Sequence, residues 1–421
     1  MKKILLTIFY QFDPWHSSIG GIQTVVQNFV KFSPAEFVIR LVGVDATADG
    51  AIGQWQQREL AGRPVEFFPL FRLREDDRRR LIPTSLRYAL GLWGKDFASD
   101  FMHFHRLEPS LFTMRWQGHK MLFVHNDIHQ QMRSSETKGI LWRRFPWLYF
   151  WFERQLMPQF HRILSCNSES TALYQQQYPQ LADRISLVRN CFDGEIFYPH
   201  SKEVREEQRR QQAIEMGLAE DTRFLLFAGR LHPQKDPLLL LEAVSLIVDR
   251  QKKDPSAAPV HLLIAGEGEL AAAMHERVAQ LGISEQVTFA GALSHQQTAT
   301  LHRLASAFVL TSAYEGLPLV VLESLACGTP VVTTQAGETP RLLKADCGIV
   351  CSTRSPKTIA SALQTILQSP EKFPAAACVQ AASPYSAKTV VKDIYDTMLR
   401  TYERPEQPDS QQSNVRLRPE F

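Results

Sequence analysis

The chain has 421 residues, of which 44% are hydrophobic, and a formal net charge of +3 at pH 7. This length and composition predict two globular domains, each with a hydrophobic core of its own. The small net charge excludes the non-specific attraction to nucleic acid that strongly basic proteins show, so we expect no nucleic-acid partner. No apolar run approaches the roughly 20 residues of a membrane-spanning helix.

The first half of the chain alternates strand-like and helix-like segments. Its first apolar run, at 4–10, outwardly resembles a short signal peptide. Gln11-Phe12-Asp13 follows where a small-residue cleavage site would stand, so a buried first strand is the better interpretation. A helix is expected at 21–32. Further strands are predicted for the short apolar runs at 37–44, 101–104, 121–124, 162–166 and 185–188.

The second half repeats this alternation after a polar and charged stretch at 193–222, where we place the connection between the domains. Asp236 and Pro237 predict the start of a helix at 238–248, and Gly328 predicts the end of another. A final helix is expected at 387–402, and the polar residues after Pro405 are expected to be disordered. Strands are predicted at 224–228, 261–265, 287–290, 308–311, 331–334 and 348–351. Strands alternating with helices predict an α/β fold with a doubly wound parallel sheet in each half.

The six cysteines lie far apart, and several stand in apolar runs. We therefore expect reduced, buried thiols in a cytosolic protein. Cys347 and Cys351 have a spacing that could form half of a metal site, but no second pair accompanies them. No metal site is predicted.

The run from Glu315 to Glu323 holds two carboxylates eight residues apart, separated by a Gly-X-Pro turn and an apolar stretch. Pro318 is well suited to be the first residue of a helix, because its missing N–H is a donor that a helix start leaves unpaired. The free N–H groups around Leu317, Leu319 and Val320 then form an anion site at the positive end of the helix dipole. Two carboxylates that can bind hydroxyls beside a phosphate site suit a sugar nucleotide.

Three further features follow predicted strands. Arg230 and Lys235 come after the strand at 224–228, where both could reach a diphosphate. Gly20 and Gly21 open the helix after the first strand, and bare glycines let backbone N–H groups approach a phosphate. His125 ends the strand at 121–124. Each feature has an ordinary alternative, namely a solvated loop, a flexible turn or a structural histidine, but ligands bind at the carboxyl ends of parallel strands. The coincidence of all of them there favours a functional site.

These motifs resemble those of the retaining glycosyltransferases of the GT-B fold, in particular glycosyltransferase family 4 (glycosyl transferases group 1). The E-x7-E, G-R-(x)n-K and Gly-Gly motifs are joined by a D-x-x-H-x-H segment at 100–105 and a V-R-N-C-F-D segment at 188–193. Cys191 stands where the family usually has glycine. The resemblance covers about 4–400 and is weakest at 45–98 and 130–160, where acceptor specificity would be expected.

The resemblance implies two Rossmann-like domains that face a cleft, with a C-terminal helix returning to the N-terminal domain. The acceptor-binding domain would be 1–200, the nucleotide-sugar-binding domain 201–385, the crossover helix 386–403 and the tail 404–421. Glu323 would bind the ribose, and Arg230 and Lys235 would neutralise the leaving diphosphate. His125 would face the donor sugar. Glu315 and the backbone of Gly316, Leu317, Leu319 and Val320 would hold sugar and phosphate, and the base would lie near Gly268, Ala292 and Leu293.

The same resemblance implies a retaining transfer in which the leaving phosphate takes the acceptor proton. No D-x-D motif occurs in the chain, so we expect neither a metal nor another cofactor beside the nucleotide-diphosphate sugar. The acceptor would be a saccharide or a lipid-linked molecule in the synthesis of cell-surface polysaccharide or glycoconjugate, and the enzyme would be cytoplasmic.

Other interpretations stay open at this point. Gly266-Glu267-Gly268 with Ala271 fits a dinucleotide fingerprint, with Glu285 as a downstream acid, which would indicate an NAD-dependent dehydrogenase. Glu267 would repel a pyrophosphate, which argues against it. A nucleotide-sugar epimerase, a phosphorylase and a non-catalytic nucleotide-binding scaffold are the remaining alternatives.

The segment 142–154 mixes seven aromatic residues with arginines, which suits peripheral contact with the inner face of a membrane. The simpler interpretation is a core-facing helix that starts at Pro146. The charged segment 72–80 is interpreted as a solvated loop.

Overall fold

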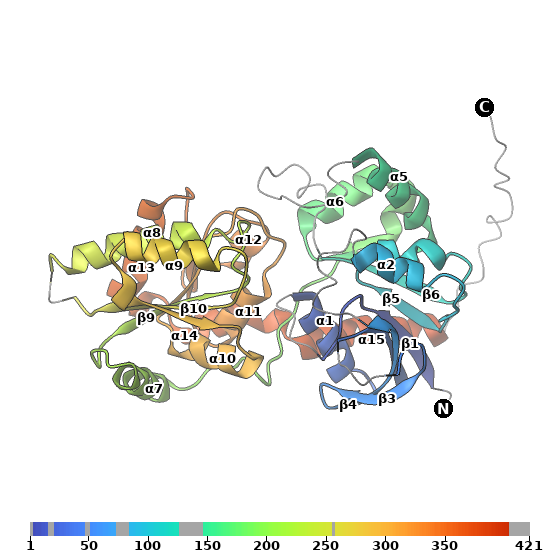
Figure 1. Ribbon diagram of the computed structural model, residues 1–421, viewed down its shortest axis with the longest axis horizontal. Helices are drawn as coiled ribbons and strands as arrows, with labels where there is room; N and C mark the ends of the chain where they lie inside the picture. The colour runs from blue at the N-terminus through green and yellow to red at the C-terminus, as the bar shows by residue number, and fades with distance from the viewer. Residues whose placement is uncertain are drawn as a thin grey trace.

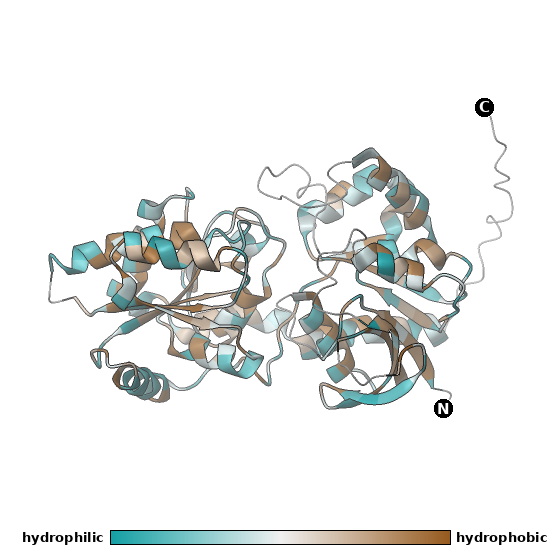
Figure 2. Ribbon diagram, viewed as in Figure 1, coloured by the Kyte–Doolittle hydropathy of each residue, from teal (hydrophilic) through white to brown (hydrophobic). Residues whose placement is uncertain are grey.

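The computed structural model describes residues 3–15, 21–46, 51–72, 84–125, 146–254 and 257–403. Two α/β domains lie side by side, with the N-terminal domain on the right and the C-terminal domain on the left of Figure 1. The central strands of both sheets are brown in Figure 2, whereas the polar helix α7 is mostly teal. Each domain therefore has its own apolar centre, as the composition predicts. In the described part of the chain, no helix has both the length and the apolar character that crossing a membrane requires.

The N-terminal sheet has the strand order β3-β4-β2-β1-β5-β6-β7-β8. Only β3 and β4 pair antiparallel among these neighbours. The strands are β1 (Ile4–Phe9), β2 (Phe37–Asp45), β3 (Gln56–Leu60), β4 (Arg63–Arg72), β5 (Phe101–Phe104), β6 (His119–Val124), β7 (Arg162–Ser165) and β8 (Ile185–Leu187). Its α-helices within the described residues are α1 (Gly21–Lys31), α2 (Thr84–Gly91), α5 (Pro146–Leu156) and α6 (Ser168–Gln177). The chain order reverses between β1 and β5, which is where such a sheet opens a crevice.

The C-terminal sheet has the order β11-β10-β9-β12-β13-β14, and all its strands are parallel. The strands are β9 (Arg223–Ala228), β10 (Val260–Ala265), β11 (Val287–Gly291), β12 (Ala307–Leu310), β13 (Val331–Thr333) and β14 (Gly348–Val350). The α-helices are α7 (Lys202–Glu215), α8 (Pro237–Gln251), α9 (Ala271–Gln280), α10 (His295–Leu304), α11 (Leu319–Ala326), α12 (Thr339–Leu342), α13 (Pro356–Gln368) and α14 (Ala375–Ala382). In Figure 1, α8, α9 and α13 cover one face and α10, α11 and α14 the other. The order reverses between β9 and β12, so this crevice lies between those two strands.

Every strand predicted from an apolar run is present, with ends shifted by at most two residues. The hairpin of β3 and β4 was not predicted. Asp236 caps α8 by accepting the N–H of Leu239, and Gly328 ends α11 with a φ of +76°, both as expected. The expected place of Pro318 was wrong by one residue, because it has an extended ψ of 127° at the N-cap and the helix begins at Leu319.

The predicted connection at 193–222 contains helix α7, which is fixed to the C-terminal domain. The guanidinium of Arg205 donates to the carbonyl oxygens of Gly328 (2.8 Å) and Arg303 (3.0 Å) and to Thr329 Oγ1 (2.9 Å). These bonds occupy backbone acceptors at the end of α11 and of α10. Most of this stretch is thus part of the C-terminal domain instead of a free linker.

Helix α15 (Ala387–Glu403) returns from the C-terminal domain and packs on the core of the N-terminal domain. Val390, Val391 and Tyr395 are buried there, and the Tyr395 hydroxyl donates to the Phe29 carbonyl at 2.8 Å. Where the chain crosses, Phe192 N donates to Tyr385 O (3.1 Å) and Ala387 N donates to Phe192 O (2.8 Å). The two crossings are therefore hydrogen-bonded to each other. Residues 404–421, expected to be disordered, lie outside the described residues.

Candidate active site

Lys235 and Glu315 meet at the carboxyl ends of β9 and β12. The Lys235 ammonium lies 2.5 Å from Glu315 Oε1, which also accepts a 2.6 Å bond from the Ser312 hydroxyl. The two loops are joined by backbone as well, since Ala313 N donates to Gln234 O at 2.8 Å. Glu315 is 8% exposed, so its carboxylate is held where water competes little. Two of the predicted site residues are thus brought together in the crevice.

Arg230 lies on the same loop but points into solvent. Its side chain is exposed and has no hydrogen bond or ion pair with the described residues. Burial lowers the pKa of the neighbouring His232, and the charges of Arg230 and of Lys235 lower it further, against an opposing effect of Glu269. The positive charges of Arg230 and Lys235 are therefore both felt at His232. An unbonded guanidinium at this place is available to an incoming anion.

Helix α11 presents its N-terminus to the same crevice. Pro318 is the N-cap, and among the described residues no side chain caps this helix start. The first N–H groups of a helix have no partner within it, so those of Leu319 and Val320 remain open to an anion. The local sequence explains this, because Gly316 and Pro318 disfavour helix before Leu319 and the apolar run after it buries the opposite face.

Glu323 lies one turn into α11 and is 5% exposed. Burial raises the pKa of its carboxyl from 4.5 to about 8. A buried acid with such a pKa is typical of a functional site. Here the ligand would supply hydrogen-bond donors, such as hydroxyls, to the carboxyl group. Glu323 is the second of the predicted carboxylates.

The N-terminal domain touches this site through the expected residues. A Cβ on Gly21 would lie 3.3 Å from Leu319 Cδ1, and a Cβ on Gly316 would lie 3.5 Å from His125 O. Asn190 Nδ2 also donates to Leu317 O at 2.6 Å. The start of α1 and the end of β6 therefore adjoin the start of α11. Gly20 lies outside the described residues.

His125 has a partner that sequence reasoning did not assign. His125 Nε2 lies 2.8 Å from His105 Nδ1, and the two rings stack with centroids 5.1 Å apart. Burial, with a smaller effect of Arg106, lowers the pKa of His125 to about 4, so the ring is neutral at pH 7. A neutral imidazole that is hydrogen-bonded through one nitrogen can use its other nitrogen to bind a polar ligand. The only signal in the sequence was that both histidines follow neighbouring strands.

The Gly266-Glu267-Gly268 turn has a structural reason for its glycines. A Cβ on Gly266 would lie 1.9 Å from Gly229 O, and one on Gly268 would lie 2.3 Å from Leu231 O. The glycines thus let the loop after β10 pass against the loop after β9, to which it is bonded by Leu231 N and Glu267 O (2.8 Å). The turn follows β10 and not β9, the strand at the reversal, where a dinucleotide fingerprint belongs. This position disfavours the dehydrogenase interpretation.

The predicted base-binding residues lie on adjacent loops. Gly268 follows β10, and Ala292 and Leu293 follow β11. Gly266 N donates to Gly291 O at 2.7 Å, which joins the two loops. They extend the crevice away from α11.

Comparison with known proteins agrees with this geometry. Residues 205–382 match the family Glycosyl transferases group 1. D-inositol 3-phosphate glycosyltransferase of Streptomyces coelicolor is 27% identical over 267 residues, which is 60% of this chain and 58% of that protein. The chain thus spans about half the length of the curated relatives it matches.

Two solved structures have the same fold over nearly the whole chain. Sucrose-phosphate synthase from Thermosynechococcus elongatus has a TM-score of 0.76 at 15% identity, covering 95% of this chain and 100% of that one. HepE from Anabaena, solved in complex with UDP-glucose, has a TM-score of 0.67 at 16% identity, covering 95% and 99%.

The chain therefore has the GT-B fold of glycosyltransferases, as the motifs predicted. Over the matched residues, its C-terminal domain is similar to the glycosyl transferases group 1.

Proposed function

We propose that the protein is a retaining glycosyltransferase that moves a sugar from a nucleotide-diphosphate sugar to a saccharide or lipid-linked acceptor. The observation that carries the proposal is the Lys235–Glu315 pair beside the uncapped start of α11, in the crevice between β9 and β12. Glu323 would take the ribose hydroxyls and His125 would face the donor sugar from the other domain. The chain's own cations would replace a metal ion.

The chemistry follows from where charge develops. The bond between the anomeric carbon and the phosphate oxygen breaks, and the acceptor oxygen bonds to that carbon on the same face. The leaving phosphate takes the acceptor proton, so no side chain is needed as a base. Lys235, Arg230 and the amide groups of α11 would stabilise the negative charge that grows on the diphosphate, and this lowers the barrier electrostatically.

The names of the relatives support the substrate class. The HepE structures contain UDP and UDP-glucose. WaaG, which has a TM-score of 0.69 and covers 94% of this chain, is described as acting in lipopolysaccharide biosynthesis. UDP is accordingly the first nucleotide to test, and a cytoplasmic role in cell-surface polysaccharide or glycoconjugate synthesis is part of the proposal.

Nucleotide binding gives a direct test of this function. At a concentration ~100 times its Kd, a true ligand stabilises the folded protein by about 2.7 kcal/mol, which raises Tm by roughly 5–10 °C. We expect such a rise with UDP, GDP or ADP in a thermal-shift assay, and the same rise with EDTA present. A rise with NAD alone would contradict the proposal and favour a dehydrogenase.

We also propose that the N-terminal domain contacts the membrane surface through α5. This helix starts at Pro146 and buries Tyr149, Glu153 and Leu156, so the expected core-facing helix is present. Its opposite face exposes Trp147 (69%) and Trp151 (54%), one turn apart. Exposed tryptophans one turn apart suit the interfacial region of a bilayer. Residues 142–145 and 73–80 lie outside the described residues.

Co-sedimentation with vesicles containing phosphatidylglycerol tests this contact. The double variant Trp147→Ala and Trp151→Ala should lose nearly all pelleting, because about 2–3 kcal/mol of apolar burial is lost for each large side chain. Ile214→Ala, an exposed apolar residue of α7 in the other domain, is the matched control and should pellet normally. Equal pelleting of the double variant and the wild type would refute the contact.

A further inference from the structure

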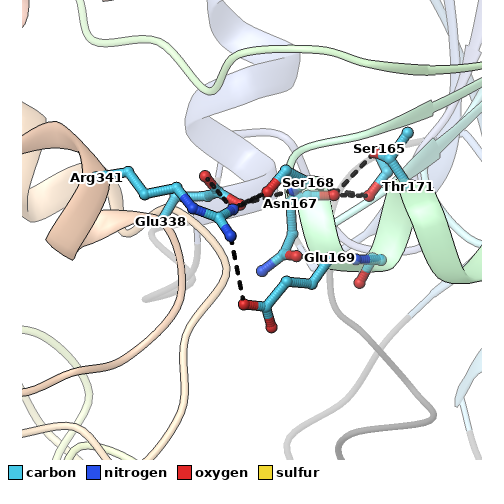
Figure 3. A network of polar contacts seen from close by, with 8 residues as sticks. Ser165, Asn167, Ser168, Glu169, Thr171, Glu338 and Arg341 are labelled. Atoms are coloured by element: carbon cyan, nitrogen blue, oxygen red, sulfur yellow. Dashed lines mark hydrogen bonds and ion pairs between the residues drawn. The ribbon is translucent and has the colours of Figure 1, made fainter.

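A polar network joins the two domains beside the candidate active site, as Figure 3 shows. Glu338, from the loop between β13 and α12, accepts bonds at Oε1 from Ser168 N (2.7 Å) and Ser168 Oγ (2.6 Å). Arg341 of α12 donates to the same Ser168 hydroxyl and to Glu338 Oε1 (3.1 Å). Its Nη2 lies 3.7 Å from Glu169 Oε1. Ser168 and Glu169 belong to the N-terminal domain, 170 residues away along the chain.

Glu338 acts on the start of α6. Asn167 caps this helix with its own side chain by accepting the N–H of Ser170 at 2.9 Å. The N–H of Ser168 needs another acceptor, and the Glu338 carboxylate provides it from the other domain. A negative charge is favoured at a helix N-terminus, and a charge-assisted bond is stronger than a neutral one.

The members of the network differ in exposure. The Glu338 side chain is 15% exposed, whereas those of Arg341 and Glu169 are 58% and 62% exposed. Exposed ion pairs contribute little because water screens them. Within this network, the contact between Glu338 and Ser168 is therefore expected to contribute most to holding the domains together.

The backbone beside Glu338 contacts the loop that holds Glu315 and Gly316. Glu338 N donates to Gly316 O at 2.9 Å. Gly337 has a φ of +62°, and a Cβ there would lie 2.1 Å from Gly316 O and 2.5 Å from Glu315 O. This loop therefore fits closely against Glu315, which pairs with Lys235, and against Gly316. The same residue, Glu338, reaches the N-terminal domain with its side chain and the site with its backbone.

We propose that Glu338 is a positioning residue that latches the two domains closed and thereby holds the Glu315–Gly316 loop in its working place. Without the latch, the domains separate at this edge of the cleft, and His125 and Gly21 no longer adjoin α11. The latch itself follows from the contacts above, whereas its effect on turnover rests on the proposed glycosyltransferase function.

The latch is tested by the distance between the domains in the full chain without ligand. The six cysteines are buried, so spin labels can be placed selectively at Gln176→Cys on α6 and Lys357→Cys on α13, both exposed positions. Pulsed electron paramagnetic resonance should give a distribution that is longer and broader in Glu338→Ala than in the wild type. Glu338→Gln keeps an acceptor oxygen and should be intermediate, and Glu169→Ala is the control that should not change. An unchanged distribution in Glu338→Ala overturns the latch.

The positioning role is tested by separating binding from turnover. The Kd of UDP should change less than about threefold in Glu338→Ala, because the proposed nucleotide contacts other than those of Gly20 and Gly21 come from the C-terminal domain. Turnover of the donor found by thermal shift should fall about tenfold, the size expected for one lost bond to a charged group. Normal turnover despite a longer interdomain distance overturns the positioning role. If UDP, GDP and ADP all fail to bind the wild type, the proposed function is wrong, and the distance measurement still decides the latch.

Discussion

Replacing Lys235 by alanine should lower the rate of glycosyl transfer about 100- to 1,000-fold. Removal of one preorganised group that stabilises developing charge typically has this effect. Lys235 is held at the site by Glu315 and by the bond between Thr311 Oγ1 and Lys235 O (2.9 Å), so it is placed before the substrate arrives. The measurement is turnover of the nucleotide sugar, with circular dichroism to show that the fold is retained.

Two further variants separate catalysis from stability. Lys235→Ala leaves the Glu315 carboxylate buried without its counter-ion, which should also lower Tm, and adding Glu315→Gln should restore Tm without restoring turnover. Arg230→Ala should abolish transfer with no loss of Tm, because its side chain is exposed and unbonded among the described residues. Near-normal turnover in either Lys235→Ala or Arg230→Ala would refute the proposed role of the cations.

The variant Glu323→Gln should be more stable than the wild type at pH 8. The pKa of Glu323 is about 8 in the folded protein and near 4.5 in the unfolded chain. Between these values the unfolded state has released the proton and the folded state keeps it. Stability therefore falls by about 1.4 kcal/mol per pH unit as pH rises from 4.5 to 8, and the loss is complete above pH 8. The variant does not ionise, so its advantage should grow over this range to ~4 kcal/mol, measured by denaturant unfolding at pH 5 and pH 8.

The same carboxyl should make nucleotide binding depend on pH. Ribose hydroxyls that donate to Glu323 favour its ionised form, so binding releases a proton and affinity rises as pH increases from 6 to 8. Glu323→Gln should remove this dependence. Uridine, which lacks the titrating phosphates of UDP, is the control ligand. If the variant keeps the pH slope of the wild type and gains no stability at pH 8, Glu323 does not have this role.

The secondary structure was predictable where a continuous run of apolar residues indicates a buried strand. The continuous apolar runs of β1 or β10 are buried along almost their whole length, which is why their ends were placed closely. The β3–β4 hairpin was missed because β3 is polar and its turn is Ala61-Gly62, with φ values of +51° and +76°. Such a turn favours asparagine or aspartate before glycine, so the alanine concealed it.

The site was predictable only in part, for a related reason. The proximity of Lys235 and Glu315 could be predicted because residues that follow neighbouring parallel strands lie at one edge of a sheet. The contact between Glu338 and Ser168 depends on how elements distant in the sequence are packed, and nothing local marks it. His105 and His125 do follow neighbouring strands, but histidines are common at strand ends, so this position alone did not assign their contact.

The paired crossings at Phe192 and Ser386 have a consequence for the ancestry of such chains. The N-terminal lobe is completed by α15, which is encoded at the far end of the gene from its other elements. A single recombination breakpoint between the lobes would separate Phe29 from Tyr395 and expose the apolar surface they share. Exchange of the N-terminal domain for another therefore requires two breakpoints, or an incoming domain whose surface already fits helix α15.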